Sequence, residues 1–435
     1  MASWRAAWTD PEKRECEVVN VAVVPNFPGL DNTNSGHRPT FPRTIHLTTD
    51  SSVLRPIDPE TLAPVGPIQS QKALHPHLKG PLSCAHPQID PLTGDLYNFN
   101  LDLGPYGATY RIFRVGASTG QTEILATISS STGIKAAYIH SFFLSPSFVV
   151  LCVPSSHLGW GGIKVVWNRN LADTIEPFDE GKKLKWIIVD RLGDKGVLGT
   201  FETDAGFFFH SVNAFEEETS EETDEDEGGN NFKQLVCDLV KYPTMDVIKS
   251  FEYDIMLQKD GADKNFWGEE GGDRARNCQP SLERYRFRVP LGTTKTSLSP
   301  FDAPERLFSI PSPHIGELPT INPRFRTRCY RYVYSLPCRG RGIITDTIAK
   351  TDTVTREVLQ WNNPAGHSPG EAIFVPRPDG TEEDDGVLLS VVLDGFAKRS
   401  YLLCLDARTM KELGRAEVGI AVGFGFHGVH CPISS

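Results

Sequence analysis

Four of the twelve histidines in this 435-residue chain stand in settings that suit metal binding. Each lies within or beside a short apolar run that reads as a β-strand. Imidazole is a good ligand for Fe, Zn, Cu and Ni. A single histidine on an apolar face is usually a core residue with a satisfied hydrogen bond, but four such positions are harder to explain separately. They are His86 in "SCAHPQIDP", His140 in "AYIHSFFL", His210 in "GFFFHSVNAFE" and His427 in "GFGFHGVH".

The other eight histidines carry weaker signals. Six lie in Pro-, Gly- or Ser-rich stretches, where an exposed loop side chain is expected. His46, in "TIHLTTD", is predicted to be a solvent-facing strand residue, and His430 is the weaker neighbour of His427. The six loop histidines are His37, His75, His77, His157, His314 and His367.

The elements that must position the four histidines read as β-strands almost throughout. Short β-branched and aromatic runs alternate with Gly, Pro, Asp and Asn, as in "TYRIFRV" followed by "EILATI". A polar turn with a central threonine recurs beside these runs, for example "DPETLAPVG", "DPLTGDLY" and "DARTMKELG". Repeated strand–turn–strand units favour a β-propeller, with a pair of β-sandwiches as the alternative. In a propeller the four histidines would come from different blades and meet on the axis.

The domain organisation follows from where this pattern holds. Residues 1–43 form a weakly patterned N-terminal segment, and residues 44–435 form the predicted β-propeller domain. The acidic stretch 216–231 interrupts it and is predicted to be a solvated loop, since it lacks the spacing of an EF-hand calcium site. Residues 258–277 are predicted to form a second long loop.

Composition excludes several classes of protein. The net charge of −11 argues against a nucleic-acid partner, which would need a basic face. The nine cysteines include no C-x-x-C pair and fit reduced thiols in the cytosol. No secretory signal is read at the N-terminus, and no apolar run reaches the length of a spanning helix. We expect a cytoplasmic protein, with peripheral membrane contact left open.

Several blocks resemble the carotenoid cleavage oxygenases, a family that includes the stilbene-cleaving dioxygenases. The blocks "AHPQIDPLTGDLYNF", "YIHSFFLSPSFVVL", "FFFHSVNAFE", "GELPTINPRF", "EDDGVLLSVV" and "GFGFHG" occur in the family's order, between about Thr48 and His427. The style of the sequence is similar to the fungal branch. The resemblance implies a seven-bladed propeller with Fe(II) on its axis, held by His86, His140, His210 and His427.

The implied activity is oxidative cleavage of a conjugated C=C bond by dioxygen into two carbonyl products. The substrate would be a carotenoid or apocarotenoid bound in an apolar tunnel, or a stilbene. Four neutral ligands leave the iron its charge and two open positions, so no catalytic residue beyond the metal centre is required. Neither HExxH nor GxSxG is present. Stilbene-cleaving relatives are expected to carry a lysine where this chain has Thr49, which favours the polyene.

The resemblance also implies three acidic residues that orient the ligand histidines: Asp50, Glu317 and Glu371. Many relatives carry glutamate in place of Asp50, and the shorter aspartate predicts a longer or water-mediated bond; the alternative is a turn cap. Relatives have a longer segment before the first iron histidine, whereas 85 residues precede His86 here. We therefore expect a propeller that is incomplete in its first blade and a chain of reduced activity.

Two other functions stay open at this level. One is an inactive propeller that acts as a binding module. The other is a propeller-shaped metal hydrolase, whose carboxylates would come from "EEDD" at Glu382–Asp385; this stretch reads better as a polar turn. Metal analysis separates them, since one iron per chain favours the oxygenase.

Overall fold

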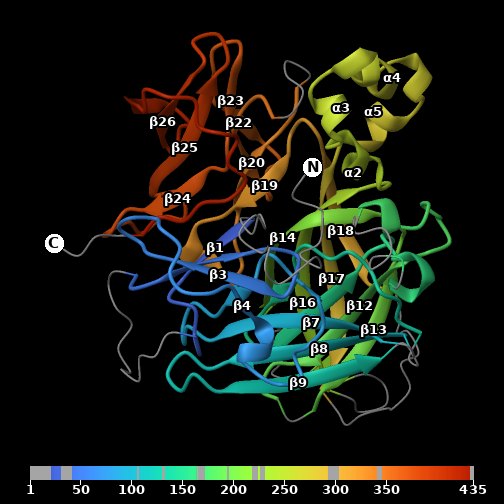
Figure 1. The fold of residues 1–435 in the computed structure, drawn as a ribbon. Helices are drawn as coiled ribbons and strands as arrows, with labels where there is room; N and C mark the ends of the chain where they lie inside the picture. The colour runs from blue at the N-terminus through green and yellow to red at the C-terminus, as the bar shows by residue number, and fades with distance from the viewer. Residues whose placement is uncertain are drawn as a thin grey trace.

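Short antiparallel β-sheets make up most of the molecule (Figure 1). We analysed a computed structural model, whose described residues are 21–30, 42–104, 107–129, 133–162, 164, 172–193, 195–217, 224–225, 231–291, 303–339 and 345–431. These residues form six sheets, each of four or five strands, and the sheets follow one another in chain order. The all-β propeller arrangement predicted from the sequence is therefore present.

The first three sheets use residues 22–203. The first contains β1 (Ala22–Pro25), β2 (Ile45–Thr48), β3 (Val53–Ile57) and β4 (Gln69–Ser70). The second contains β5 (Leu82–Ser83), β7 (Leu96–Gly104), β8 (Gly107–Val115) and β9 (Thr122–Ser129), with β6 (Gln88–Ile89) paired to β7. The third contains β10 (Phe143–Leu144), β11 (Phe148–Val153), β12 (Leu184–Asp190) and β13 (Val197–Thr203).

The last three sheets use residues 207–417. The fourth contains β14 (Phe207–Glu217), β16 (Asn231–Tyr242), β17 (Ser281–Pro290) and β18 (Glu305–Pro311), with β15 (Asp224–Glu225) paired to β16. The fifth contains β19 (Glu317–Thr320), β20 (Tyr332–Leu336), β21 (Ala349–Asp352) and β22 (Val358–Gln360). The sixth contains β23 (His367–Pro369), β25 (Gly386–Asp394), β26 (Arg399–Asp406) and β27 (Glu412–Glu417), with β24 (Ile373–Pro376) paired to β25.

The recurring polar turn behaves as its residue types predict. The Asp58 carboxylate accepts hydrogen bonds from the Thr61 backbone N–H at 2.7 Å and from the Thr61 hydroxyl at 2.8 Å. Asp406 accepts the same two bonds from Thr409, at 2.7 Å and 2.8 Å. Such side-chain-to-backbone bonds stabilise tight turns, so these motifs fix where one strand ends and the next begins.

Five apolar clusters join the six sheets, one for each pair of consecutive sheets, and the cluster between the second and third sheets also includes Phe207 and Tyr242 of the fourth. Within the described residues no such cluster joins the sixth sheet to the first. In the sixth sheet Leu388 is fully buried against the fifth sheet, whereas the cross-strand pair Val391 and Leu402, on the other face, is 37% exposed at each side chain. That face is apolar but not covered by another sheet.

The prediction of seven blades is therefore wrong for the described part of the chain, which forms six. The first sheet has all four strands, so it is not the incomplete blade that we expected. A two-faced sheet inside a propeller needs a neighbour on each side. The outer face of the first sheet, with Val23 and Leu47 half-buried, and that of the sixth are the surfaces that a further blade would cover.

Residues 258–277 were predicted to be a loop, and this is also wrong. They contain α4 (Ala262–Trp267) and α5 (Arg274–Asn277), which follow α2 (Asp246–Ser250) and α3 (Tyr253–Met256). These helices gather on one side of the sheets (Figure 1). Phe266 and Ile255 are buried in the cluster between the second and third sheets. The prediction failed because the apolar residues of this stretch stand singly among glycines and charged residues, so the sequence shows no helical periodicity.

The acidic stretch 216–231 and the N-terminal segment 1–43 are described by the structure only in part. Most of the acidic stretch 216–231 lies outside the described residues, apart from the ends of β14 and β16 and the short β15. Of the N-terminal segment 1–43, the strand β1 is described and pairs with β2. No helix in the described part of the chain is long and apolar enough to cross a bilayer.

Candidate metal centre

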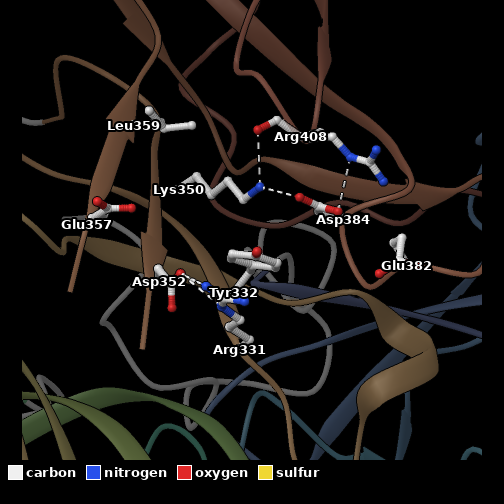
Figure 2. Close-up of a pocket in the computed structure, with 9 residues that line it drawn as sticks. All are labelled: Arg331, Tyr332, Lys350, Asp352, Glu357, Leu359, Glu382, Asp384 and Arg408. Carbon is white, nitrogen blue, oxygen red and sulfur yellow. Dashed lines mark hydrogen bonds and ion pairs between the residues drawn. The ribbon is translucent and has the colours of Figure 1, made fainter. Parts of the chain in front are cut away.

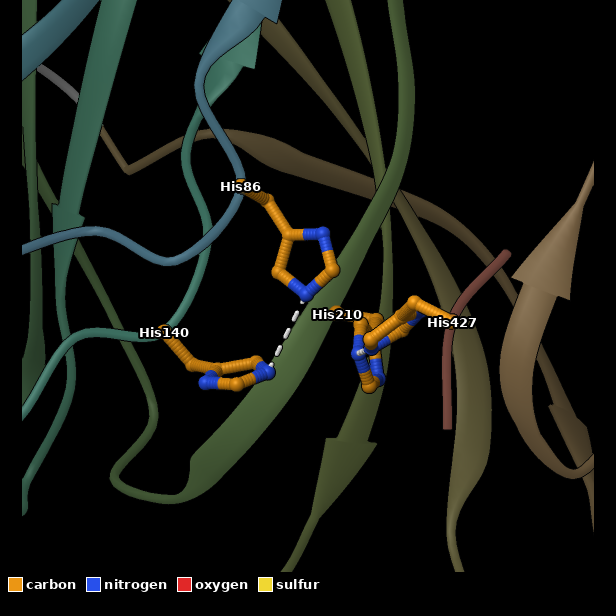
Figure 3. A group of neighbouring side chains, drawn as sticks. All are labelled: His86, His140, His210 and His427. Carbon is orange, nitrogen blue, oxygen red and sulfur yellow. Dashed lines mark hydrogen bonds between the residues drawn. The ribbon is translucent and has the colours of Figure 1, made fainter. Parts of the chain in front are cut away.

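The four histidines singled out in the sequence converge on one point (Figure 3). His86 follows β5, His140 precedes β10, His210 lies on β14, and His427 lies in the extended segment after β27. One ring nitrogen of each lies within 4.8 Å of those of the other three. Four separate stretches of chain thus place one imidazole each around a common centre.

The ring nitrogens that meet at this centre are the Nε2 atoms. The Nε2 atoms of His86 and His140 are 3.2 Å apart, and so are those of His210 and His427. The rings of His86 and His427 stand nearly perpendicular, with centroids 4.2 Å apart. Uncharged imidazoles directed this way present lone pairs to a shared point, which is the arrangement that a metal ion requires.

The protonation state of the rings fits this role. Burial lowers the pKa of His86 well below its usual range, and possible positive charge on His427, His140 and His210 lowers it further. Burial also lowers the pKa of His210, although the nearby Glu317 carboxylate opposes that shift. Burial disfavours the charged form of a histidine. These two rings are therefore neutral at pH 7 and free to act as ligands.

Three carboxylates bond the outer Nδ1 atoms of three of these rings. His210 Nδ1 lies 2.6 Å from Oε2 of Glu317, and His427 Nδ1 lies 3.1 Å from Oε1 of Glu371. A carboxylate accepts only, so each Nδ1 carries the proton and each Nε2 is left as the acceptor. This is the arrangement that holds ligand histidines in one tautomer and one orientation.

Asp50 makes a direct bond, although its length predicted a longer or water-mediated one. Its Oδ1 lies 2.9 Å from His140 Nδ1. The backbone brings the short side chain close, because the Asp50 carbonyl accepts from the Ser83 N–H at 3.0 Å and ties this turn to β5. Tyr138 then donates to Oδ2 of Asp50 at 3.0 Å. The carboxylate is fixed from both sides, and it orients a ring instead of capping a turn.

His86 is held differently from the other three. Among the described residues no carboxylate contacts its ring; its backbone N–H contacts Cys84 Sγ at 3.3 Å, and the Cys84 thiol in turn contacts the His140 carbonyl at 2.9 Å. Burial raises the pKa of the Cys84 thiol well above its usual range, and the Asp50 charge adds to that shift. A protonated thiol here links the loops that carry His86 and His140 and offers no thiolate to a metal.

Buried aromatic side chains pack near the rings and carboxylates of the histidine centre. Phe209 is buried, and its ring lies 5.7 Å from that of His140 between centroids. Burial raises the pKa of Tyr242, and the Glu317 charge adds to that shift, so its hydroxyl stays protonated. The three carboxylate side chains bonded to the rings are only 11–15% exposed, and a setting with little water strengthens each of these bonds.

The sequence reasoning missed several residues of this shell. Tyr138 stands two residues before His140, and residues two apart in an extended chain share a face, so the signal was present. Asn213, three residues after His210, holds a neighbouring loop through its side chain, with one bond of 2.9 Å to the Arg328 carbonyl. It belongs to the block "FHSVNAFE", but its partner lies 115 residues away and cannot be read from spacing.

Three of the remaining histidines are placed differently from the prediction. His367 begins β23, its side chain is 11% exposed, and its Nδ1 lies 2.8 Å from the Tyr401 hydroxyl. His46 is buried and not solvent-facing, because its side of β2 packs on Phe27, with ring centroids 5.4 Å apart. His157 is buried and not an exposed loop residue. His430 is exposed, as a weak candidate should be, and His37 lies outside the described residues.

The acidic "EEDD" stretch is not among the residues that meet at the histidine centre. Its Glu382 and Asp384 line a charged cavity of about 640 Å³ between the fifth and sixth sheets (Figure 2). The Lys350 ammonium donates to Asp384 at 2.6 Å, and the Arg331 and Tyr332 backbone N–H groups donate to Glu383 at 2.9 Å and 2.7 Å. These carboxylates are occupied by the chain's own donors, as a structural polar turn requires.

Comparison with known proteins places this architecture among polyene-cleaving enzymes. The sequence profile described as retinal pigment epithelial membrane protein matches residues 4–432. A carotenoid dioxygenase of Neurospora crassa is 51% identical over 435 aligned positions, covering 95% of this chain and 69% of that protein. A torulene dioxygenase of Fusarium fujikuroi is 47% identical over 424, covering 95% and 71%.

Solved structures agree on the fold. A variant of the Synechocystis apocarotenoid oxygenase matches with a TM-score of 0.67 and 20% identity, over 95% of this chain and 74% of that one. The lignostilbene dioxygenase of Pseudomonas brassicacearum matches with a TM-score of 0.67 and 18% identity, over 98% and 78%.

Proposed function

The chain belongs to the retinal pigment epithelial membrane protein family, and we propose that it is a dioxygenase that cleaves a conjugated C=C bond of a carotenoid or apocarotenoid. Both atoms of O₂ enter the products, since one C=C bond becomes two C=O bonds. The observation that carries this proposal is the cup of four histidine rings, whose inward nitrogens lie within 4.8 Å of one another. Two fungal relatives, 51% and 47% identical, are a carotenoid dioxygenase and a torulene dioxygenase, which supports the substrate class.

We propose that the metal is Fe(II), held by His86, His140, His210 and His427. The donor set fits, because imidazole suits Fe(II) and no described carboxylate reaches the inner side of the cup. When bound, the iron would supply the redox-active centre that O₂ needs in order to react with an alkene. The proposed reaction needs no nucleophile or general base from the protein.

The protein's own contribution is orientation and exclusion of water. Asp50, Glu317 and Glu371 hold three Nδ1–H groups outward, so three Nε2 lone pairs stay aimed at the centre. The buried aromatic wall near His140 and His210 keeps these bonds in a low-dielectric setting, where they are stronger than in water. An apolar substrate would replace water at the open side of the cup.

Three alternatives make different predictions. A stilbene substrate is disfavoured because Thr49 offers no charge to a phenol. A binding module without activity would hold no metal. A hydrolase would need free carboxylates, and those of Glu383 and Asp384 already bond the chain's own donors. Peripheral membrane contact, a cytoplasmic location and the absence of a nucleic-acid partner stay predictions.

The test is metal content together with product analysis. The chain is purified without oxygen, loaded with Fe(II), desalted and assayed for iron per chain, then supplied with torulene, β-carotene, an apocarotenal and resveratrol. We expect one iron per chain and a pair of carbonyl products from a polyene. No retained iron, or faster turnover of resveratrol than of any polyene, would contradict the proposal.

A further inference from the structure

Asn213 is a buried asparagine on β14, three residues beyond His210. Its three side-chain bonds in the described part of the chain all go to backbone groups of the loop that follows β19. The Nδ2 group donates to the Phe325 carbonyl at 3.1 Å and to the Arg328 carbonyl at 2.9 Å, and Oδ1 accepts from the Thr327 N–H at 3.0 Å. One side chain thus ties this loop to the strand that carries His210.

The strand β14 is irregular between Phe208 and Asn213. Its register against β16 shifts twice, between Phe208 and Ser211 and again between Ser211 and Asn213. In a regular strand the side chains alternate between two faces, whereas a bulge adds a residue and re-aims the side chains around it. These shifts set the directions of two side chains, that of His210 toward the histidine centre and that of Asn213 toward the loop.

The loop that Asn213 holds continues the strand that begins with Glu317. The backbone near both ends of this segment is strained, because Leu318 has φ +52° and Thr327 has φ +63°, in the left-handed region that residues other than glycine rarely adopt. Such conformations persist only where the surroundings enforce them. The Asn213 bonds surround Thr327, and Leu318 and Ile321 are buried. The segment is therefore a packed connection between the Asn213 bonds and Glu317.

The position of Glu317 depends on this backbone more than is the case for the other two carboxylates. Its Oε2 accepts from His210 Nδ1 and, at 3.2 Å, from the Leu318 N–H, whereas its buried Oε1 has no hydrogen-bond partner among the described residues. Asp50 and Glu371 each receive a bond from a further donor on their second oxygen. A displacement of the segment would therefore move the Glu317 carboxylate with little to oppose it.

We propose that Asn213 is a positioning residue for the metal centre, which holds the Glu317 carboxylate against His210 by tying the loop after β19 to β14. The inference rests on the proposed iron site and adds to it a residue whose own bonds go to neither the ring nor its carboxylate. A displaced carboxylate would lengthen the 2.6 Å bond from His210 Nδ1, and Nε2 would no longer be fixed toward the centre. Aspartate at position 213 would keep the acceptor and lose both N–H donors, and alanine would lose all three bonds.

The test measures the affinity of the parent, Asn213→Asp and Asn213→Ala for Fe(II), by anaerobic competition with a chromophoric chelator. Loss of an outer support of a ligand histidine should weaken iron binding by about 10-fold. Asn363→Ala is the matched control, because Asn363 likewise donates to a backbone carbonyl, that of Asp346 at 2.7 Å, and lies in a loop between the fifth and sixth sheets. This control should bind iron as the parent does.

Double variants separate a positioning role from a merely structural one. If Asn213 acts through Glu317, Asn213→Ala should cost less than about 2-fold in a Glu317→Gln background and about 10-fold in a Glu371→Gln background, because changes at coupled sites do not add and changes at independent sites do. A general structural defect would lower the affinity equally in both. With Co(II) in place of Fe(II), the visible absorption bands report the arrangement of the ligands, and they should shift in Asn213→Ala but not in Asn363→Ala.

The outcomes distinguish this inference from the proposed function. Iron affinity equal to that of the parent in Asn213→Ala, or equal losses in the two backgrounds, would overturn the inference and leave the proposed function intact. Asn213→Asp, which keeps the size of the side chain, carries the same comparison should Asn213→Ala not fold. A parent that retains neither Fe(II) nor Co(II) would overturn both.

Discussion

Replacing Glu317 by glutamine should weaken iron binding more than the same change at Glu371. Glu317 makes the shortest of the three carboxylate–imidazole bonds, 2.6 Å against 2.9 Å for Asp50 and 3.1 Å for Glu371. Short bonds to an ionised acceptor are roughly twice as strong as neutral ones. An amide keeps the size of the carboxylate but loses its charge and orients the ring less well.

The magnitude follows from these distances. Removing an outer partner of a ligand histidine costs about 10- to 100-fold in affinity, roughly 1.4–2.7 kcal/mol. We place Glu317→Gln near the upper end of that range, because its bond is short and its partner His210 is buried. Glu371→Gln belongs near the lower end, because its bond to His427 is long and its second bond, from the Gly428 N–H at 2.9 Å, is one that an amide oxygen can still accept.

The assay is an anaerobic competition for Fe(II) between each protein and a chromophoric chelator. Glu305→Gln serves as the control, since Glu305 pairs with Arg286 on the surface at 3.0 Å. All three variants should unfold at temperatures close to that of the parent. The reasoning is refuted if Glu317→Gln and Glu371→Gln hold iron like the parent, or if Glu371→Gln is the weaker binder of the two.

His140→Ala should purify with little iron, because it removes one Nε2 and leaves Asp50 without its partner; full iron content would exclude this residue from the centre. A second variant tests pH: burial lowers the pKa of His157 to about 4, so the unfolded chain takes up its proton first as the pH falls below about 6.5. The free energy of unfolding therefore falls as the pH drops from about 6.5 to 4, by about 2 kcal/mol between pH 7 and pH 5. When the iron-free protein is unfolded with urea at several pH values, His157→Asn should lack this part of the fall. An unchanged dependence of the unfolding free energy on pH in His157→Asn would contradict the prediction. Thr49 predicts substrate choice: in side-by-side assays Thr49→Lys should raise resveratrol turnover relative to an apocarotenal, and no change in that ratio would remove Thr49 as a determinant.

The sequence predicted a site correctly where a residue able to bind a metal also stands in a recognisable strand pattern. The four histidines were recognisable because each stands in a strand-like apolar run that belongs to a family block. Hairpins such as β8–β9 and β25–β26 were readable because alternating strands flank a short polar turn. The three carboxylates came from the family resemblance and not from spacing, since Glu317 lies 107 residues from its partner His210.

Other features depend on packing that no local pattern carries. His46 stands among polar neighbours, yet its face of the first sheet meets Phe27. The number of sheets depends on which apolar faces find each other, and both faces of the sixth sheet look alike in sequence although only one is covered.

The segment that carries His427 differs from those that carry the other three histidines. From residue 418 to 431 it is exposed at most positions, and apart from the ring contacts among the four histidines, His427 and Gly428 are held by the two bonds to Glu371. Ordering each such residue costs about 1–2 kcal/mol of conformational entropy. Docking of this tail and occupancy of the centre are therefore coupled equilibria, and the coupling is reciprocal. A bound ion would hold the tail in place, and a change that loosens the tail would lower the apparent affinity for the ion by the fraction of time the tail is undocked.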